Sequence, residues 1–67
     1  MLKELIGPLD HVIEVELEAY DGVGTLHIAY EYGEPSRELD LGEISDRFIK
    51  ELEEELSAYP LITYTKN

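Results

Sequence analysis

The sequence predicts a small α+β domain, in which a mainly antiparallel β-sheet (a β-hairpin plus one or two short strands) packs on one amphipathic α-helix. Apolar and polar residues alternate from His11 to Tyr20 and again from Thr25 to Tyr32, which is typical of half-buried strands. From Leu41 to about Ala58, apolar residues recur every three or four positions, which predicts a helix with one apolar face. A chain of 67 residues cannot enclose two separate cores, so residues 1–67 are expected to form a single domain.

The segment from Met1 to Leu9 is expected to hold one helical turn, which Gly7-Pro8 ends. The strand that follows has two chemically different sides. By alternation, the apolar side is made of Ile13, Val15, Leu17 and Ala19. The other side is made of Val12, Glu14, Glu16, Glu18 and Tyr20.

Asp21-Gly22 joins the two predicted strands and is a favoured pair for a type I′ hairpin turn. A two-residue loop pairs Tyr20 with Val23 and therefore aligns the apolar side along its length, ending with Ile13 opposite Tyr30. A four-residue loop would place two glutamates, Glu14 and Glu31, directly opposite each other. Like charges in that position are unfavourable, so the tighter turn is favoured.

The second half of the chain is expected to form a short strand over Arg37–Leu41, the helix, and a last strand over Leu61–Thr65. Asp40 followed by Glu43 resembles a capping box, which starts the predicted helix at Leu41. The apolar stripe of this helix consists of Leu41, Ile44, Phe48, Ile49, Leu52 and Leu56. Tyr59-Pro60 ends the helix, because the residue before a proline disfavours helical geometry.

Charge and composition exclude several classes of function. The chain carries 16 acidic and 5 basic residues, a formal net charge of −11, so direct binding to nucleic acid is not expected. It has no cysteine, hence no disulfide or thiolate metal site, and the two histidines lack ligand spacing. No apolar run is long enough to span a membrane and no signal peptide is visible, so a cytoplasmic protein is expected. No cofactor and no catalytic residues are predicted, because no nucleophile or phosphate-binding motif occurs.

Two acidic groups are the candidate partner-binding residues. The first is the row Glu14, Glu16 and Glu18 with Tyr20 beside the turn. Glutamates two apart on a strand lie about 6.8 Å apart on one face, and Glu is a poor strand former, so the row is unusual. The second group is Glu51, Glu53, Glu54 and Glu55, near the unfavourable C-terminal end of the helix dipole. Ordinary solvated charge is the alternative interpretation of both groups.

Histidine and tyrosine side chains give weaker signals. His27 is expected to face Glu16 across the hairpin, which favours the charged imidazole. Tyr30 and Tyr32 fall on the apolar side by alternation, so core packing is the simpler interpretation of both. Glu55 falls within the arc of the apolar stripe and is expected to find a hydrogen-bond donor or to lie near its edge.

The leading hypothesis is a non-enzymatic protein-binding module whose acidic surface docks on a basic, nucleic-acid-binding protein surface and blocks or regulates it. In size and charge the chain is similar to small acidic inhibitors that mimic nucleic acid, such as phage anti-restriction and anti-CRISPR proteins, although it shares no motif with them. The alternative is a self-associating structural protein, a homo-oligomer or a subunit of a larger assembly, in which the charge maintains solubility.

Overall fold

The structure, a computed structural model, describes residues 1–67 and confirms the α+β fold class. Two helices and one four-stranded sheet make up the chain. In order they are α1 (Leu2–Leu5), β1 (Val12–Tyr20), β2 (Val23–Tyr30), β3 (Arg37–Glu43), α2 (Asp46–Leu56) and β4 (Thr63–Lys66). Neither helix has the length and apolar composition that crossing a membrane requires.

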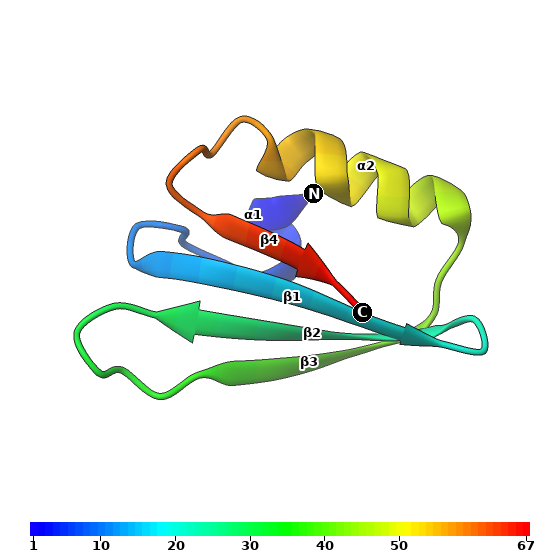
Figure 1. The fold of residues 1–67 in the computed structure, drawn as a ribbon, viewed down its shortest axis with the longest axis horizontal. Helices are drawn as coiled ribbons and strands as arrows, with labels where there is room; N and C mark the ends of the chain where they lie inside the picture. Colours follow the sequence, from blue (N-terminus) through cyan, green and yellow to red (C-terminus); the bar gives the residue numbers. More distant parts are fainter.

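The sheet has the strand order β3-β2-β1-β4, so β1 and β2 lie in the middle and β3 and β4 form the edges (Figure 1). β1, β2 and β3 form an antiparallel meander, whereas β4 runs parallel to β1. The chain needs a long crossover to return a strand in the parallel direction, and α2 supplies it. The last strand was predicted at Leu61–Thr65; the observed strand begins two residues later and ends one residue later.

Both helices cover the same face of the sheet (Figure 1). The core lies between the two layers and consists of Leu2, Ile6, Val12, Val15, Leu17, Leu26, Ile28, Leu52 and Leu56. Seven of these nine residues have an exposed fraction of 2% or less. The core is small, in agreement with the short chain. The other face of the sheet has no covering layer and is called the open face below.

The hairpin turn and its register are confirmed. Asp21 (φ 52°) and Gly22 (φ 77°) both have positive φ, as a type I′ turn requires. Tyr20 pairs with Val23, and the register continues without a shift as far as the pairing of Glu14 with Ala29.

Two details at the far end of the hairpin differ from the prediction. A bulge between Val12 and Glu14 shifts the register, so Val12 pairs with Tyr30 and is buried, while Ile13 is 43% exposed. An extra residue in one strand reverses the alternation beyond it, which is why Ile13 leaves the core. Tyr32 lies beyond the end of β2, has positive φ and is exposed, so it contributes nothing to the apolar side.

The boundary between β3 and α2 also differs from the prediction. The segment up to Glu43 continues as a strand, and the helix begins only at Asp46. Ser45 is the N-cap, and its hydroxyl accepts a hydrogen bond from the backbone N–H of Phe48 at 3.1 Å. The prediction of a capping box at Asp40 is therefore wrong, because Asp40 lies within β3. A helix starting there would have placed Gly42 in its first turns, which costs about 1 kcal/mol relative to alanine.

Gly24 allows the start of β2 to approach the β3–α2 connection closely. A Cβ atom added at this position would lie 2.6 Å from Cδ1 of Ile44, well inside van der Waals contact. The backbone N–H of Ile44 donates to the carbonyl of Gly22 at 2.9 Å, which holds the connection against the hairpin. The absence of a side chain at Gly24 therefore leaves the room that Ile44 occupies.

Candidate functional site

Carboxylates of β1 and β3 share the open face of the sheet. Alternation and register assign six acidic side chains to it: Glu14, Glu16, Glu18, Glu38, Asp40 and Glu43. Four of them form two rows across the three strands, and in each row a residue of β2 without a negative charge lies between the two acids. One row is Glu16–His27–Glu38 and the next is Glu18–Thr25–Asp40. Residues of β1 and β3 in one row are separated by about 9.6 Å, twice the spacing of neighbouring strands.

Basic residues lie elsewhere in the molecule. Lys3 is on α1, while Arg47 and Lys50 are on α2, which covers the opposite face. Lys66 aligns with Leu17, so it is on the covered side of β4. The fifth, Arg37, aligns with Ile28 and donates hydrogen bonds to the carbonyl of Ile6 (2.7 Å) and the hydroxyl of Tyr30 (3.1 Å). The open face therefore carries carboxylates with no lysine or arginine among them.

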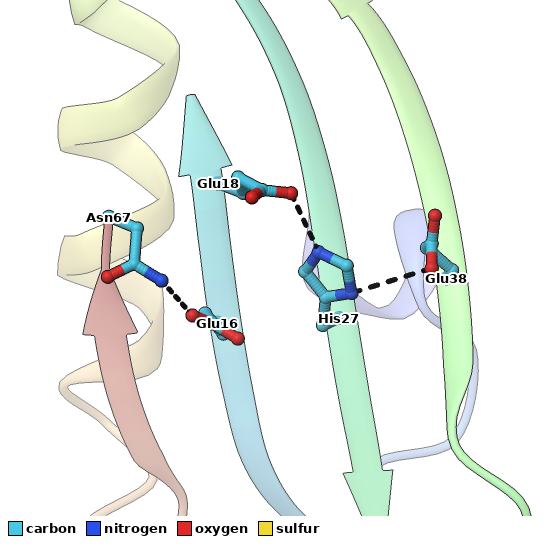
Figure 2. A network of polar contacts seen from close by, with 5 residues as sticks. All are labelled: Glu16, Glu18, His27, Glu38 and Asn67. Carbon is cyan, nitrogen blue, oxygen red and sulfur yellow. Dashed lines mark hydrogen bonds and ion pairs between the residues drawn. The ribbon is translucent and has the colours of Figure 1, made fainter. Parts of the chain in front are cut away.

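His27 is central to this face (Figure 2). Its Nε2 lies 3.2 Å from Oε1 of Glu18, and its Nδ1 lies 3.6 Å from Oε2 of Glu38. Glu16 was the predicted partner of this histidine, and the two residues do pair in register. The Glu16 carboxylate instead accepts a hydrogen bond from the side-chain amide of Asn67 (Figure 2). The hydrogen-bond partner of His27 on β1 is therefore Glu18, its diagonal neighbour, and not Glu16.

The hydrogen bond to Glu18 raises the pKa of His27 above its ordinary value, and the negative charges of Glu38 and Glu16 act in the same direction. A neutral imidazole donates through one nitrogen only, whereas the charged ring donates through both. Protonation therefore suits a ring placed between two carboxylates. The other histidine, His11, lies outside this row and has a raised pKa because it bonds to Glu31 at 2.8 Å. No group of three or more His, Asp or Glu side chains in the chain is arranged to hold a metal ion.

The helix acids do not join the open face. Since α2 lies over the covered face, the four glutamates on it belong to a different surface from the β1 row. That surface has mixed charge: the Arg47 guanidinium donates to Glu51 at 3.2 Å, and Lys50 lies between them in sequence. The Tyr64 hydroxyl donates to Glu53 at 3.2 Å, and burial, followed by the charge of Glu53, raises the pKa of Tyr64 to about 12.

Glu55 has an identifiable role in the fold. Its carboxylate accepts a hydrogen bond from the backbone N–H of Leu2 at 3.1 Å and thus connects the start of α1 to α2. The expectation that this partly buried glutamate finds a donor is confirmed. Glu54 is exposed and has no side-chain partner. One partner surface cannot lie flat against both predicted acidic groups, because the two groups are on opposite layers.

Tyr20 extends the open face toward the turn. It is 85% exposed and lines a surface depression of about 450 Å³ with Glu18, Asp21, Val23 and Thr25. Sequence reasoning missed three members of the site, Glu38, Asp40 and Glu43. The alternation of Glu38, Leu39, Asp40 and Leu41 was the available signal, because it has the period of a strand with acids on one face.

The fold and the open face define a class: a small α+β domain with one covered apolar sheet face and one uncovered acidic face. Searches against protein-family models, curated proteins and solved structures found no match to this chain.

Proposed function

We propose that the chain is a non-enzymatic protein-binding module of the cytoplasm, whose open face docks on a basic, nucleic-acid-binding surface of another protein. The observation that supports this most strongly is the separation of charge. Six carboxylates lie on one uncovered sheet face, and every lysine and arginine lies away from it.

Such a face is suited to a basic partner for two reasons. The strands hold the backbone of each glutamate in place, so less freedom is lost on binding than in a flexible acidic tail. A field of a single sign also steers a partner of opposite charge and speeds association, in a manner that depends on salt. Docking on a nucleic-acid-binding surface would exclude nucleic acid from it, which gives the module an inhibitory or regulatory action.

Charge reversal on the two layers tests the proposal. The variant Glu14→Lys/Glu16→Lys/Glu18→Lys changes the open face, and the matched control Glu51→Lys/Glu53→Lys/Glu54→Lys makes the same change in net charge on the helix layer. Both are compared with the original chain by calorimetry against a panel of purified basic nucleic-acid-binding domains. We expect at least one domain to bind and to be released by duplex DNA. Its affinity should fall with salt, and by about 100-fold or more in the open-face variant.

The control variant should lose far less affinity, and circular dichroism should show that both variants remain folded. Equal losses in the two variants would mean that net charge alone drives the association. Binding that duplex DNA leaves unchanged would argue against a nucleic-acid-binding surface as the target.

Self-association is the second candidate function, and exposed apolar side chains favour it. Leu61 is 92% exposed beside a depression of about 340 Å³. Six of the eight residues that line this depression are hydrophobic: Leu9, Val12, Ala58, Tyr59, Leu61 and Ile62. Light scattering after size exclusion separates the two functions, because an apolar dimer persists at high salt whereas a charge-driven complex dissociates. A salt-resistant dimer that Leu61→Asp disrupts would support this candidate.

A further inference from the structure

β3 is an edge strand whose outer side is free. It pairs with β2 only, and no other segment of the chain lies on its other side (Figure 1). Alternate N–H and C=O groups of an edge strand point away from the sheet, and they form a template for one more strand. The regular part of this edge is Arg37–Asp40, because the register with β2 shifts after Asp40.

The side chains of this edge alternate between two chemistries. Glu38 and Asp40 lie on the open face, where 70% of the Glu38 side chain is exposed. Leu39 lies between them, pairs with Leu26 and is half-buried at the rim of the core. The one basic residue of the strand, Arg37, is held away from the open face by its hydrogen bonds to Ile6 and Tyr30.

The negative charges of β3 determine which kind of strand can pair with its free edge. If a second copy paired through its own β3, related by a two-fold axis, Glu38 and Asp40 would meet the same two acids of the other copy. Like charges in adjacent strands are destabilising. An extended segment with lysine or arginine two residues apart places both cations beside these carboxylates. The residue between the two cations then lies on the covered side, next to Leu39, where an apolar side chain fits.

We propose that the β3 edge binds an extended basic segment of the partner protein as a fifth strand, with cationic residues at alternate positions and an apolar residue between them. The inference rests on the proposed function and deepens it, because it assigns the mode of docking. Backbone hydrogen bonds supply affinity in this arrangement, and the alternation of side chains supplies specificity. The acids that keep the edge from pairing with its own copies also define the partner it accepts.

Three fluorescent peptides of equal charge test the mode of binding. The first has the central sequence Val-Lys-Val-Lys-Val. The second has the same composition with the two lysines adjacent, so that they point to opposite faces of a strand. The third is the first peptide N-methylated at its three central amides, which blocks backbone pairing on both of its edges. We expect the first to bind and the other two to bind at least about tenfold more weakly, because each loses cross-strand pairs or backbone bonds.

Hydrogen exchange and charge reversal locate the binding site. With the first peptide at saturation, amides of β3 should gain protection while those of β4, the other edge, should not. Glu38→Lys/Asp40→Lys should weaken binding by about tenfold or more, whereas the matched reversal Glu14→Lys/Glu18→Lys on β1 should weaken it less. Equal binding of the N-methylated peptide, protection absent from β3, or a dimer of the chain already paired through β3 would each overturn the inference.

The same reagents distinguish this inference from the proposed function. If a basic domain binds and the β1 triple reversal abolishes that binding, but β3 gains no protection in the complex, the open face is the docking surface and the fifth strand is wrong. If no basic domain binds, yet the alternating peptide pairs with β3, the edge site stands and the proposed docking across the open face is wrong.

Discussion

The two faces of the sheet are built from alternate residues of the same strands, yet they differ completely in chemistry. On the covered face, Val15 and Leu17 are fully buried under α2. On the open face, the residues on either side of them in sequence are glutamates in contact with solvent. Along β1, the residues that stabilise the core therefore alternate with the residues that carry the negative charge. Changes on one face should therefore leave the property of the other face nearly intact. The first and last of the four predictions below test this separation, and the two between them test contacts on the covered side.

The largest effect is expected from truncation on the covered face. Leu17→Ala removes a fully buried side chain and leaves a cavity, which costs about 2–5 kcal/mol. A core this small supplies only about 3–5 kcal/mol in total, so the variant should be largely unfolded at 25 °C. An open-face residue of the same strand provides the control: the Glu14 side chain is exposed and makes no hydrogen bond, so Glu14→Ala should change the free energy of unfolding by about 0.5 kcal/mol or less. Urea denaturation followed by circular dichroism measures both, and similar losses would contradict the separation of the faces.

The next effect concerns the close approach of β2 to the β3–α2 connection. Gly24→Ala places a methyl group 2.6 Å from Cδ1 of Ile44, and such overpacking costs about 1–3 kcal/mol. Ile44→Val removes that terminal methyl group, so the double variant should recover part of the loss. A double-mutant cycle from thermal unfolding measures this coupling. Strictly additive effects would show that the clash is relieved by movement of the backbone.

A smaller effect is expected from the two helix glutamates that differ in contact. Glu55→Ala removes the acceptor for the backbone N–H of Leu2 and should cost about 1 kcal/mol. Glu54→Ala removes an exposed side chain without a partner, so it should be close to neutral. Chemical denaturation of the two variants under identical conditions gives the comparison. A larger loss of stability in Glu54→Ala than in Glu55→Ala would contradict a stabilising role for the hydrogen bond between Glu55 and Leu2.

The smallest effect tests the electrostatics of the open face alone. Glu18→Gln should lower the pKa of His27, and Glu38→Gln should lower it less, because Glu18 provides the hydrogen bond. A raised pKa in the folded state means that protonation of His27 favours folding. That contribution is fully present below the unfolded pKa of about 6.5 and disappears as the pH rises through the folded value.

An NMR titration of the two imidazole rings checks this prediction. His11 serves as the internal control, because its pKa depends on Glu31 and should not move in either variant. Unchanged titration of His27 in both variants would show that solvent screens this row completely.

Local patterns were sufficient to predict the hairpin. Alternation placed Val15 and Leu17 in the core, and the Asp21-Gly22 turn set their partners on β2. The alternation did not predict the bulge that exposes Ile13. A bulge is defined by how two strands pair, so the pattern of one strand alone does not reveal it. The N-terminus of α2 was misplaced because Leu41 and Ile44 fit the period of a helix as well as the packing at the end of β3.

The candidate site was predicted only in part for a related reason. Three glutamates on one strand are visible in the sequence, whereas a face that spans β1 and β3 depends on which strands become neighbours. Asp40 was interpreted as a helix cap, and that interpretation removed it from the sheet. Both acidic groups were predicted to bind the partner, because no local pattern shows that α2 and the β1 row lie on opposite sides of the sheet.

The parallel strand β4 has a consequence for how the chain folds. The meander β1–β2–β3 joins neighbouring segments over short loops. In contrast, β4 pairs with β1, which is distant in sequence, so this pairing can form only after α2 has crossed the sheet. We expect pulse-labelled exchange during refolding to protect β2 before β4. Until β4 arrives, the other side of β1 is an unpaired edge next to an incomplete apolar layer. The partly folded chain is therefore most prone to aggregate with its own copies before β4 pairs with β1.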